Sequence, residues 1–120
     1  MKVRKVEEVE ALEGNEGTII RQIFHPHNTL NGIRYSISHS IVMPGKRSKL
    51  HKMATSEIYY VLEGKGILHI DDEVVAVSKD HVIYIPPHSK QFIENTGNKE
   101  LKILCIVDPA WRQEDEISLE

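Results

Sequence analysis

The chain has 120 residues, 40% of them hydrophobic and 28% charged, with a formal net charge of −3 at pH 7. These values are typical of one folded globular domain, exclude a disordered chain and give no reason to expect a nucleic-acid partner. No apolar run is long enough to span a membrane, and the charged start MKVRKVEEVE is unlike a secretory signal. The single cysteine cannot form an internal disulfide. We therefore expect a cytoplasmic protein.

The first part of the chain predicts an N-terminal arm, residues 1–16, followed by two strands. Four apolar residues lie three positions apart in the arm: Val3, Val6, Val9 and Leu12. That spacing fits either a short amphipathic helix or a strand followed by a loop. The β-branched segment TIIRQIF (18–24) predicts a strand, and HPHNTLNG (25–32) predicts a turn. From 33 to 43, apolar residues and His39 alternate with polar ones, which predicts a strand with one apolar face.

Short strands are expected through the rest of the chain, each bounded by glycine, proline or asparagine. We predict them, in chain order, at 57–64, 66–70, 74–77, 81–87, 91–95 and 101–107. The last one is apolar throughout 103–107, so we expect the core to cover one face and another subunit to cover the other. Residues 109–120 form an acidic tail, expected as a docked turn or a frayed end. Many short strands with little helix signal predict one all-β antiparallel sandwich or barrel over 17–108.

Polar side chains at the start of apolar strands indicate a candidate site. Glu57 begins a strand on which Tyr59 shares its face. A carboxylate that faces the inside of a barrel needs a partner, such as a metal ion, a cationic ligand or a hydrogen-bond network. His51 follows a glycine turn and Gln91 follows a proline turn, so we expect both side chains to approach Glu57. Tyr59 is the candidate catalytic residue, as a hydrogen-bond donor or general acid.

The spacing of these residues resembles the two motifs of the cupin superfamily. In the first motif, Gly-x5-His-x-His-x3–4-Glu-x6-Gly, the residues in register are Gly45, His51, Glu57 and Gly64, with Met53 in place of the second histidine. In the second motif, Gly-x5-Pro-x-Gly-x2-His-x3-Asn, Pro86 and Asn95 match, and the replacements are Asp80, His88 and Gln91. The resemblance covers about residues 33–108 and implies a double-stranded β-helix, or jelly-roll barrel, in one domain. The segment CIVDPAWRQEDE is similar to the ending of small single-domain cupins, some of which have mannose-6-phosphate-isomerase-like labels.

The same resemblance implies a divalent transition metal held by His51, Glu57 and Gln91. Cupins usually hold their metal with three histidines and one glutamate, whereas this chain offers an amide at Gln91 and a thioether at Met53. The related phosphomannose isomerases use glutamine, histidine and glutamate at zinc, so an amide ligand fits. The oxygen-rich set would accept Zn, Mn, Fe(II) or Ni, which are not distinguished. The alternative is a metal-free hydrogen-bond network among the same three side chains.

Other histidines are additional ligand candidates. His25 and His27 flank a proline in a predicted turn, His39 lies on the apolar face of its strand, and His88 is close to Gln91. The structural alternative for each is a solvated or hydrogen-bonded histidine without a metal.

Two functions follow as hypotheses. The first is a metal-dependent enzyme, an isomerase, epimerase or dioxygenase, that acts on a small polar metabolite of sugar-like or carboxylate type. The alternative is a metal-free module that binds or senses such a molecule without catalysis, and a third hypothesis is a structural dimer with a vestigial pocket. We expect a homodimer, because the last strand is apolar throughout and small cupins commonly pair through their sheets.

Overall fold

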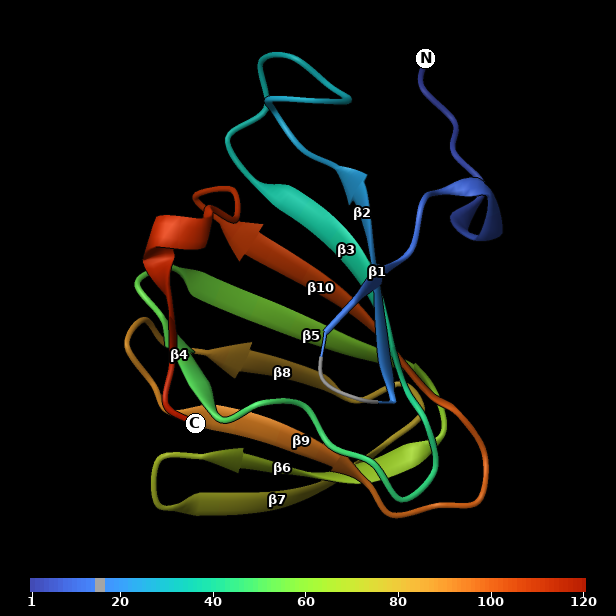
Figure 1. The fold of residues 1–120 in the computed structure, drawn as a ribbon, viewed down its shortest axis with the longest axis vertical. Helices are drawn as coiled ribbons and strands as arrows, with labels where there is room; N and C mark the ends of the chain where they lie inside the picture. The colour runs from blue at the N-terminus through green and yellow to red at the C-terminus, as the bar shows by residue number, and fades with distance from the viewer. Residues whose placement is uncertain (15–16) are drawn as a thin grey trace.

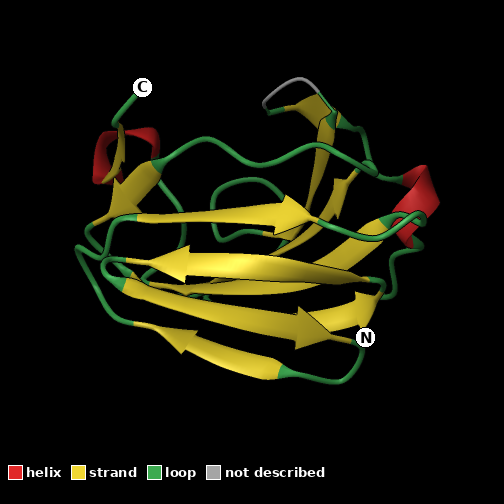
Figure 2. Ribbon diagram, turned by 90° about the horizontal axis from the view of Figure 1, so that it is seen from below, coloured by secondary structure: helices red, strands yellow, loops and turns green. Residues whose placement is uncertain are grey.

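The computed structural model describes residues 1–14 and 17–120, whose strands form two antiparallel sheets (Figure 1). Sheet A has six strands in the spatial order β1 (Leu12–Glu13), β2 (Thr18–Phe24), β3 (Ser36–Val42), β10 (Leu101–Asp108), β5 (Ser56–Glu63) and β8 (Val82–Ile85). Sheet B has five, in the order β11 (Glu116–Ser118), β4 (His51–Met53), β9 (Gln91–Asn95), β6 (Lys65–Ile70) and β7 (Glu73–Ser78). Figure 2 shows the strands stacked in layers. The predicted all-β antiparallel architecture in one domain is confirmed.

The hydrophobic core lies between the two sheets and receives side chains from both. Its main cluster consists of Val42, Val61, Leu68, Val77, Ile93, Leu101 and Ile103. Val61 and Leu101 are fully buried, and burying a side chain of this kind stabilises a fold by roughly 1.5–3 kcal/mol. Because β3, β5 and β10 of sheet A face β6, β7 and β9 of sheet B across this cluster, the core fixes the distance between the sheets.

The N-terminal arm has a short strand, as one alternative expected, and a 3-10 turn without buried residues in place of an amphipathic helix. A 3-10 helix, η1, covers Val6–Glu8, and β1 then pairs with β2, with Leu12 opposite Ile20. Residues 15 and 16, which belong to the predicted arm, lie outside the described residues. Within residues 1–14 and 17–120, no helix has the length and hydrophobicity that crossing a membrane requires.

Two short strands were not predicted, because each has only three residues and no apolar alternation. β4 lies in the segment expected as a loop, and β11 follows a second 3-10 helix, η2 (Gln113–Asp115), in the acidic tail. The two strands pair with each other, placing Glu116 opposite Met53 and Ser118 opposite His51. The tail is therefore not frayed: it contains a docked turn, as one alternative expected, and also adds an edge strand to sheet B, which was not predicted.

The apolar face of β3 lies on the outside of the barrel. His39 is opposite Leu104 of β10, and the next residue of β10, Cys105, points inward to Glu57. Since neighbours on a strand face opposite ways, His39 and Leu104 share the outer face, and Ser38 shares the inner face with Cys105. The strand predicted from the alternation is confirmed over 36–42, but its polar face lines the barrel.

The four positions where the cupin motifs have glycine all adopt positive φ angles. The values are 76° at Gly45, 86° at Gly64, 71° at Asp80 and 67° at His88. Aspartate and, less often, histidine tolerate this left-handed region, so the motif's turns persist where two of its glycines do not.

Candidate functional site

Four polar side chains form a hydrogen-bonded network inside the barrel, hereafter the Glu57 network. Gln91 Nε2 donates to Glu57 Oε1 at 2.7 Å, and the Tyr59 hydroxyl donates to Gln91 Oε1 at 2.9 Å. The thiol of Cys105 donates to Glu57 Oε2 at 3.4 Å. Glu57 and Gln91 are only 4% and 1% exposed. Both carboxylate oxygens of Glu57 and both polar atoms of Gln91 therefore have partners within the protein.

The network joins the two sheets across the interior. Glu57 and Tyr59 lie two residues apart on β5, so their side chains share its inner face. Cys105 lies opposite Tyr59 on the neighbouring strand β10. Gln91 begins β9 of sheet B, on the other side of the barrel. The expected approach of Gln91 to Glu57 follows directly from this packing of one sheet on the other.

Burial controls the protonation of the network. Desolvation raises the pKa of Glu57, while the hydrogen bond from Gln91 and the nearby charge of His51 act in the opposite direction. Burial also raises the pKa of the Tyr59 phenol and the Cys105 thiol, and the charge of Glu57 raises both further. Phenol and thiol thus remain protonated at neutral pH and act as donors.

His51 lies beside the network on β4. Its backbone pairs with Gln91 of β9, so the two side chains share the inner face of sheet B. Its Nδ1 lies 2.7 Å from the carbonyl oxygen of Lys49. A carbonyl oxygen only accepts, so Nδ1 carries the proton and Nε2 is the nitrogen left with a lone pair in the neutral ring.

Met53, which replaces the second histidine of the motif, packs in an apolar cluster at this end of the barrel. The cluster contains Met53, Cys105 and Val107, with Trp111 and Tyr59 packed against it. The indole nitrogen of Trp111 donates to Glu116 of β11 at 3.2 Å. Trp111 and the C-terminal strand therefore cover the end of the barrel at which the network lies. Sequence reasoning missed Cys105 and Trp111, because an apolar strand and an acidic tail carry no signal for such roles.

Three of the additional histidine candidates have side chains that lie away from Glu57, and whether any of them binds a metal stays a prediction from the sequence. His39 is on the outer face of sheet A, as described above. Nε2 of His25 bonds the carbonyl oxygen of Trp111 at 2.7 Å, and its Nδ1 accepts from the backbone of His27. His88 is exposed, and only its backbone nitrogen reaches toward the site, by donating to the carbonyl oxygen of Met53.

The donor set does not fit a metal ion in the arrangement that the structure shows. Gln91 turns its amide nitrogen, not its oxygen, toward Glu57. The sulfur of Met53 lies in an apolar cluster. Among the residues that the structure describes, no three His, Cys, Asp or Glu side chains are grouped so that they could hold a metal. The metal at His51, Glu57 and Gln91 stays a prediction from the resemblance.

Residues 38–107, more than half of the chain, match the family model described as a cupin domain. The chain belongs to the cupin family. The match includes Glu57, Gln91 and Cys105 and both motif segments, so the Glu57 network occupies the interior of a cupin barrel. The resemblance read from the motifs is confirmed.

Known proteins similar to this cupin differ in what their names describe. An uncharacterised protein of Methanocaldococcus jannaschii is 43% identical over all of this chain and 98% of its own length. A mannose-1-phosphate guanylyltransferase of Sinorhizobium fredii is 32% identical over 83% of this chain, which spans 20% of that protein. The polyketide cyclase RemF of Streptomyces resistomycificus superposes with a TM-score of 0.82 over all of this chain and 86% of its own, at 18% identity. The last comparison supports the fold alone.

Proposed function

We propose that this cupin binds a small, neutral, hydroxyl-bearing molecule at the Glu57 network, without a metal ion. The observation that carries the proposal is the direct hydrogen bond from the amide nitrogen of Gln91 to Glu57. A metal between these two residues would need the amide oxygen on that side. As arranged, the network instead offers a buried carboxylate acceptor, the second N–H of the Gln91 amide as a donor and the phenol oxygen of Tyr59 as a further acceptor, which is a suitable set for hydroxyl groups.

The charge of Glu57 favours a neutral ligand over an anionic one. Two anions in a poorly solvated interior repel each other strongly, whereas a ligand hydroxyl donates to the carboxylate and lowers its desolvation penalty. A sugar-like molecule has the required hydroxyl groups. The name of one relative, a mannose-1-phosphate guanylyltransferase, refers to a sugar, but in a phosphorylated and therefore anionic form, so it supports only the sugar part of this class.

Tyr59 has the role of orienting the amide in this proposal. Its hydroxyl donates to Gln91 Oε1, which fixes Nε2 toward Glu57. A ligand enters past Trp111, which covers this end of the barrel. Because Trp111 is the chain's single tryptophan, its fluorescence reports directly on occupancy of the barrel.

The test is a titration of chelator-treated protein with mannose, other monosaccharides and nucleosides, followed by Trp111 fluorescence. Saturable binding is expected for at least one of them. Tyr59→Phe should weaken it about tenfold, the effect of losing one good hydrogen bond. The matched control is Tyr60→Phe, since the neighbouring hydroxyl bonds Asp80 on the outer face and should leave binding unchanged. Binding that requires added metal, or equal effects of the two variants, would refute the proposal.

One observation favours the metal-dependent enzyme as a second candidate. His51 donates Nδ1–H to a backbone carbonyl, an arrangement common for histidines that bind metals through Nε2. A turn of the Gln91 amide would add an oxygen ligand beside Glu57. Isomerase or dioxygenase activity that depends on a bound metal and is lost in His51→Ala would favour this candidate.

A homodimer forms part of the proposal. Four large apolar residues on the outer face of sheet A are exposed: Ile58, Tyr60, Val82 and Tyr84. Leu104 and Ile106 of β10 lie half-buried on the same face. Apolar patches of this kind mark protein interfaces, so a second copy is expected here.

A further inference from the structure

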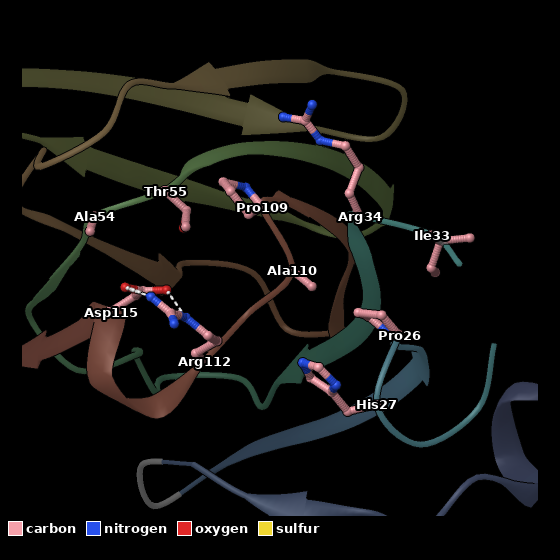
Figure 3. A pocket seen from close by; sticks show the side chains of 10 residues that line it. All are labelled: Pro26, His27, Ile33, Arg34, Ala54, Thr55, Pro109, Ala110, Arg112 and Asp115. Carbon is pink, nitrogen blue, oxygen red and sulfur yellow. Dashed lines mark hydrogen bonds and ion pairs between the residues drawn. The ribbon is translucent and has the colours of Figure 1, made fainter. Parts of the chain in front are cut away.

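A cavity of about 510 Å³ lies outside the barrel at the end of β10 (Figure 3). The residues of its lining that matter here are Arg34, Thr55, Pro109, Ala110, Arg112 and Asp115. The Glu57 network contributes none of them. The cavity is therefore a separate candidate site, formed by the turns that follow β2, β4 and β10.

Thr55 provides an unsatisfied polar group in the wall of this cavity. The residue is only 4% exposed, and its hydroxyl oxygen has no hydrogen-bond partner among the described residues. A buried hydroxyl without a partner costs roughly 1–3 kcal/mol. The oxygen has no exposed surface, so a turn about the Cα–Cβ bond is needed to bring it into the cavity.

The charged groups of the cavity are held in fixed pairs. Arg112 donates to both carboxylate oxygens of Asp115, at 2.8 and 3.0 Å. Arg34 bonds Asp108, which lies outside the lining, at 3.2 and 3.5 Å. These bonds use only some of the N–H groups of each guanidinium. Since each cation has its own carboxylate, the pairs balance, and a ligand of zero net charge fits them best.

An arginine–aspartate pair lies at each side of the cavity. Figure 3 shows Arg34 with Ile33 at one side, and Thr55, Asp115 and Arg112 at the other. The backbone of Ala54 donates to the carbonyl oxygen of Asp115 at 2.9 Å, which keeps Thr55 on the same wall as Asp115. Pro109 and Ala110 provide an apolar stretch between the two walls. Such a site offers N–H donors of Arg34 at one end, and the Arg112–Asp115 pair with the Thr55 hydroxyl at the other.

We propose that this cavity binds a small amino acid in its zwitterionic form. Free N–H groups of Arg34 receive the carboxylate, and Asp115 with the Thr55 hydroxyl accepts the ammonium group. The short hydrocarbon part lies against Pro109 and Ala110. The ligand gives Thr55 the hydrogen-bond partner that it lacks, and it adds no net charge to the balanced pairs.

The test is a titration of the ¹⁵N-labelled full chain with glycine, β-alanine and γ-aminobutyrate, followed by NMR of the backbone amides and arginine side chains. Butyrate and butylamine serve as probes that carry one charge each. We expect saturable shifts at residues 54–56 and 110–112 for at least one zwitterion, which binds more tightly than either single-charge probe. Zwitterions that bind no better than butyrate or butylamine would overturn the proposal.

Variants then identify the two ends of the site. Thr55→Val should weaken binding of the zwitterion about tenfold. Thr96→Val, at an exposed position, should leave that binding unchanged. Arg34→Gln should lower the affinity for the zwitterion to the affinity measured for butylamine. An unchanged affinity in Arg34→Gln or in Thr55→Val would contradict the assignment. Tyr59→Phe, which weakens sugar binding in the barrel, should not affect amino-acid binding, so failures of the two proposals are distinguishable.

Discussion

The buried charge of Glu57 lowers the stability of the fold and is a candidate for a functional role. Its carboxylate lies inside the barrel, where burial raises its pKa above the value of 4.5 expected in the unfolded chain. As pH rises from 4.5 through the folded-state pKa, the unfolded chain loses its proton first, so the free energy of unfolding falls. The penalty is complete only at pH values above the folded-state pKa of Glu57. Buried charges retained at such a cost in stability are candidates for function.

Glu57→Gln should therefore stabilise the fold at high pH and not at low pH. The amide keeps the shape and an acceptor for Gln91 but removes the charge. We expect a gain of about 1 kcal/mol or more near pH 8 and almost none near pH 4, measured by urea denaturation at both values. A gain that does not depend on pH would show that the charge of Glu57 is not the cause.

His39 should give the opposite pH dependence. Burial lowers its pKa from 6.5, and the charges of Lys102 and Arg21 lower it further. As pH falls below about 6.5, the unfolded chain takes up the proton first, so the free energy of unfolding decreases toward acid pH. His39→Leu should remove this decrease between about pH 6.5 and 5, whereas His27→Leu, at an exposed position, should retain it. Denaturation curves across that range are the measurement, and equal slopes in both variants would contradict the account.

At the scale of elements, the turn between β5 and β6 depends on a glycine for two reasons. Gly64 has a φ of 86°, and a Cβ there would lie 2.6 Å from the carbonyl oxygen of Glu100. Gly45 has a φ of 76°, and a Cβ added there would meet no atom of the described residues within 4 Å. The first position thus combines backbone strain with a clash against backbone, and the second has strain alone.

Gly64→Ala should consequently destabilise the protein more than Gly45→Ala. Strain alone costs about 1 kcal/mol, and the clash should roughly double that at Gly64 or exceed it. Thermal or urea unfolding of the two variants side by side checks the difference. Equal losses would mean that the segment around Glu100 moves aside freely.

For the whole molecule, the sequence alone could predict the fold and part of the site. Strand periodicity and turn residues determine the sheets, and the spacing of Glu57 and Gln91 led correctly to their contact. The outward position of His39 was not predictable, because alternation defines two faces without saying which one is inside. The strands β4 and β11 were not predicted, because their pairing depends on tertiary contacts. The contributions of Cys105 and Trp111 to the site also depend on tertiary contacts, so the sequence did not predict them.

The oligomeric state is the second question at this scale. Val82 on the outer face of sheet A is 60% exposed, and Val74 on β7 of sheet B is 62% exposed. If the outer face of sheet A forms a dimer, Val82→Lys should convert it to a monomer, while Val74→Lys should not. Size-exclusion chromatography with light scattering measures this. A wild-type monomer, or a dimer that survives Val82→Lys, would contradict the proposed interface.

The most direct test of the proposed function combines elemental analysis and ligand binding on one preparation, purified without chelator. The account predicts a substoichiometric metal content, and a sugar-like ligand that changes Trp111 fluorescence equally before and after chelation. One transition-metal ion per chain, lost in Glu57→Gln together with ligand binding, would contradict it.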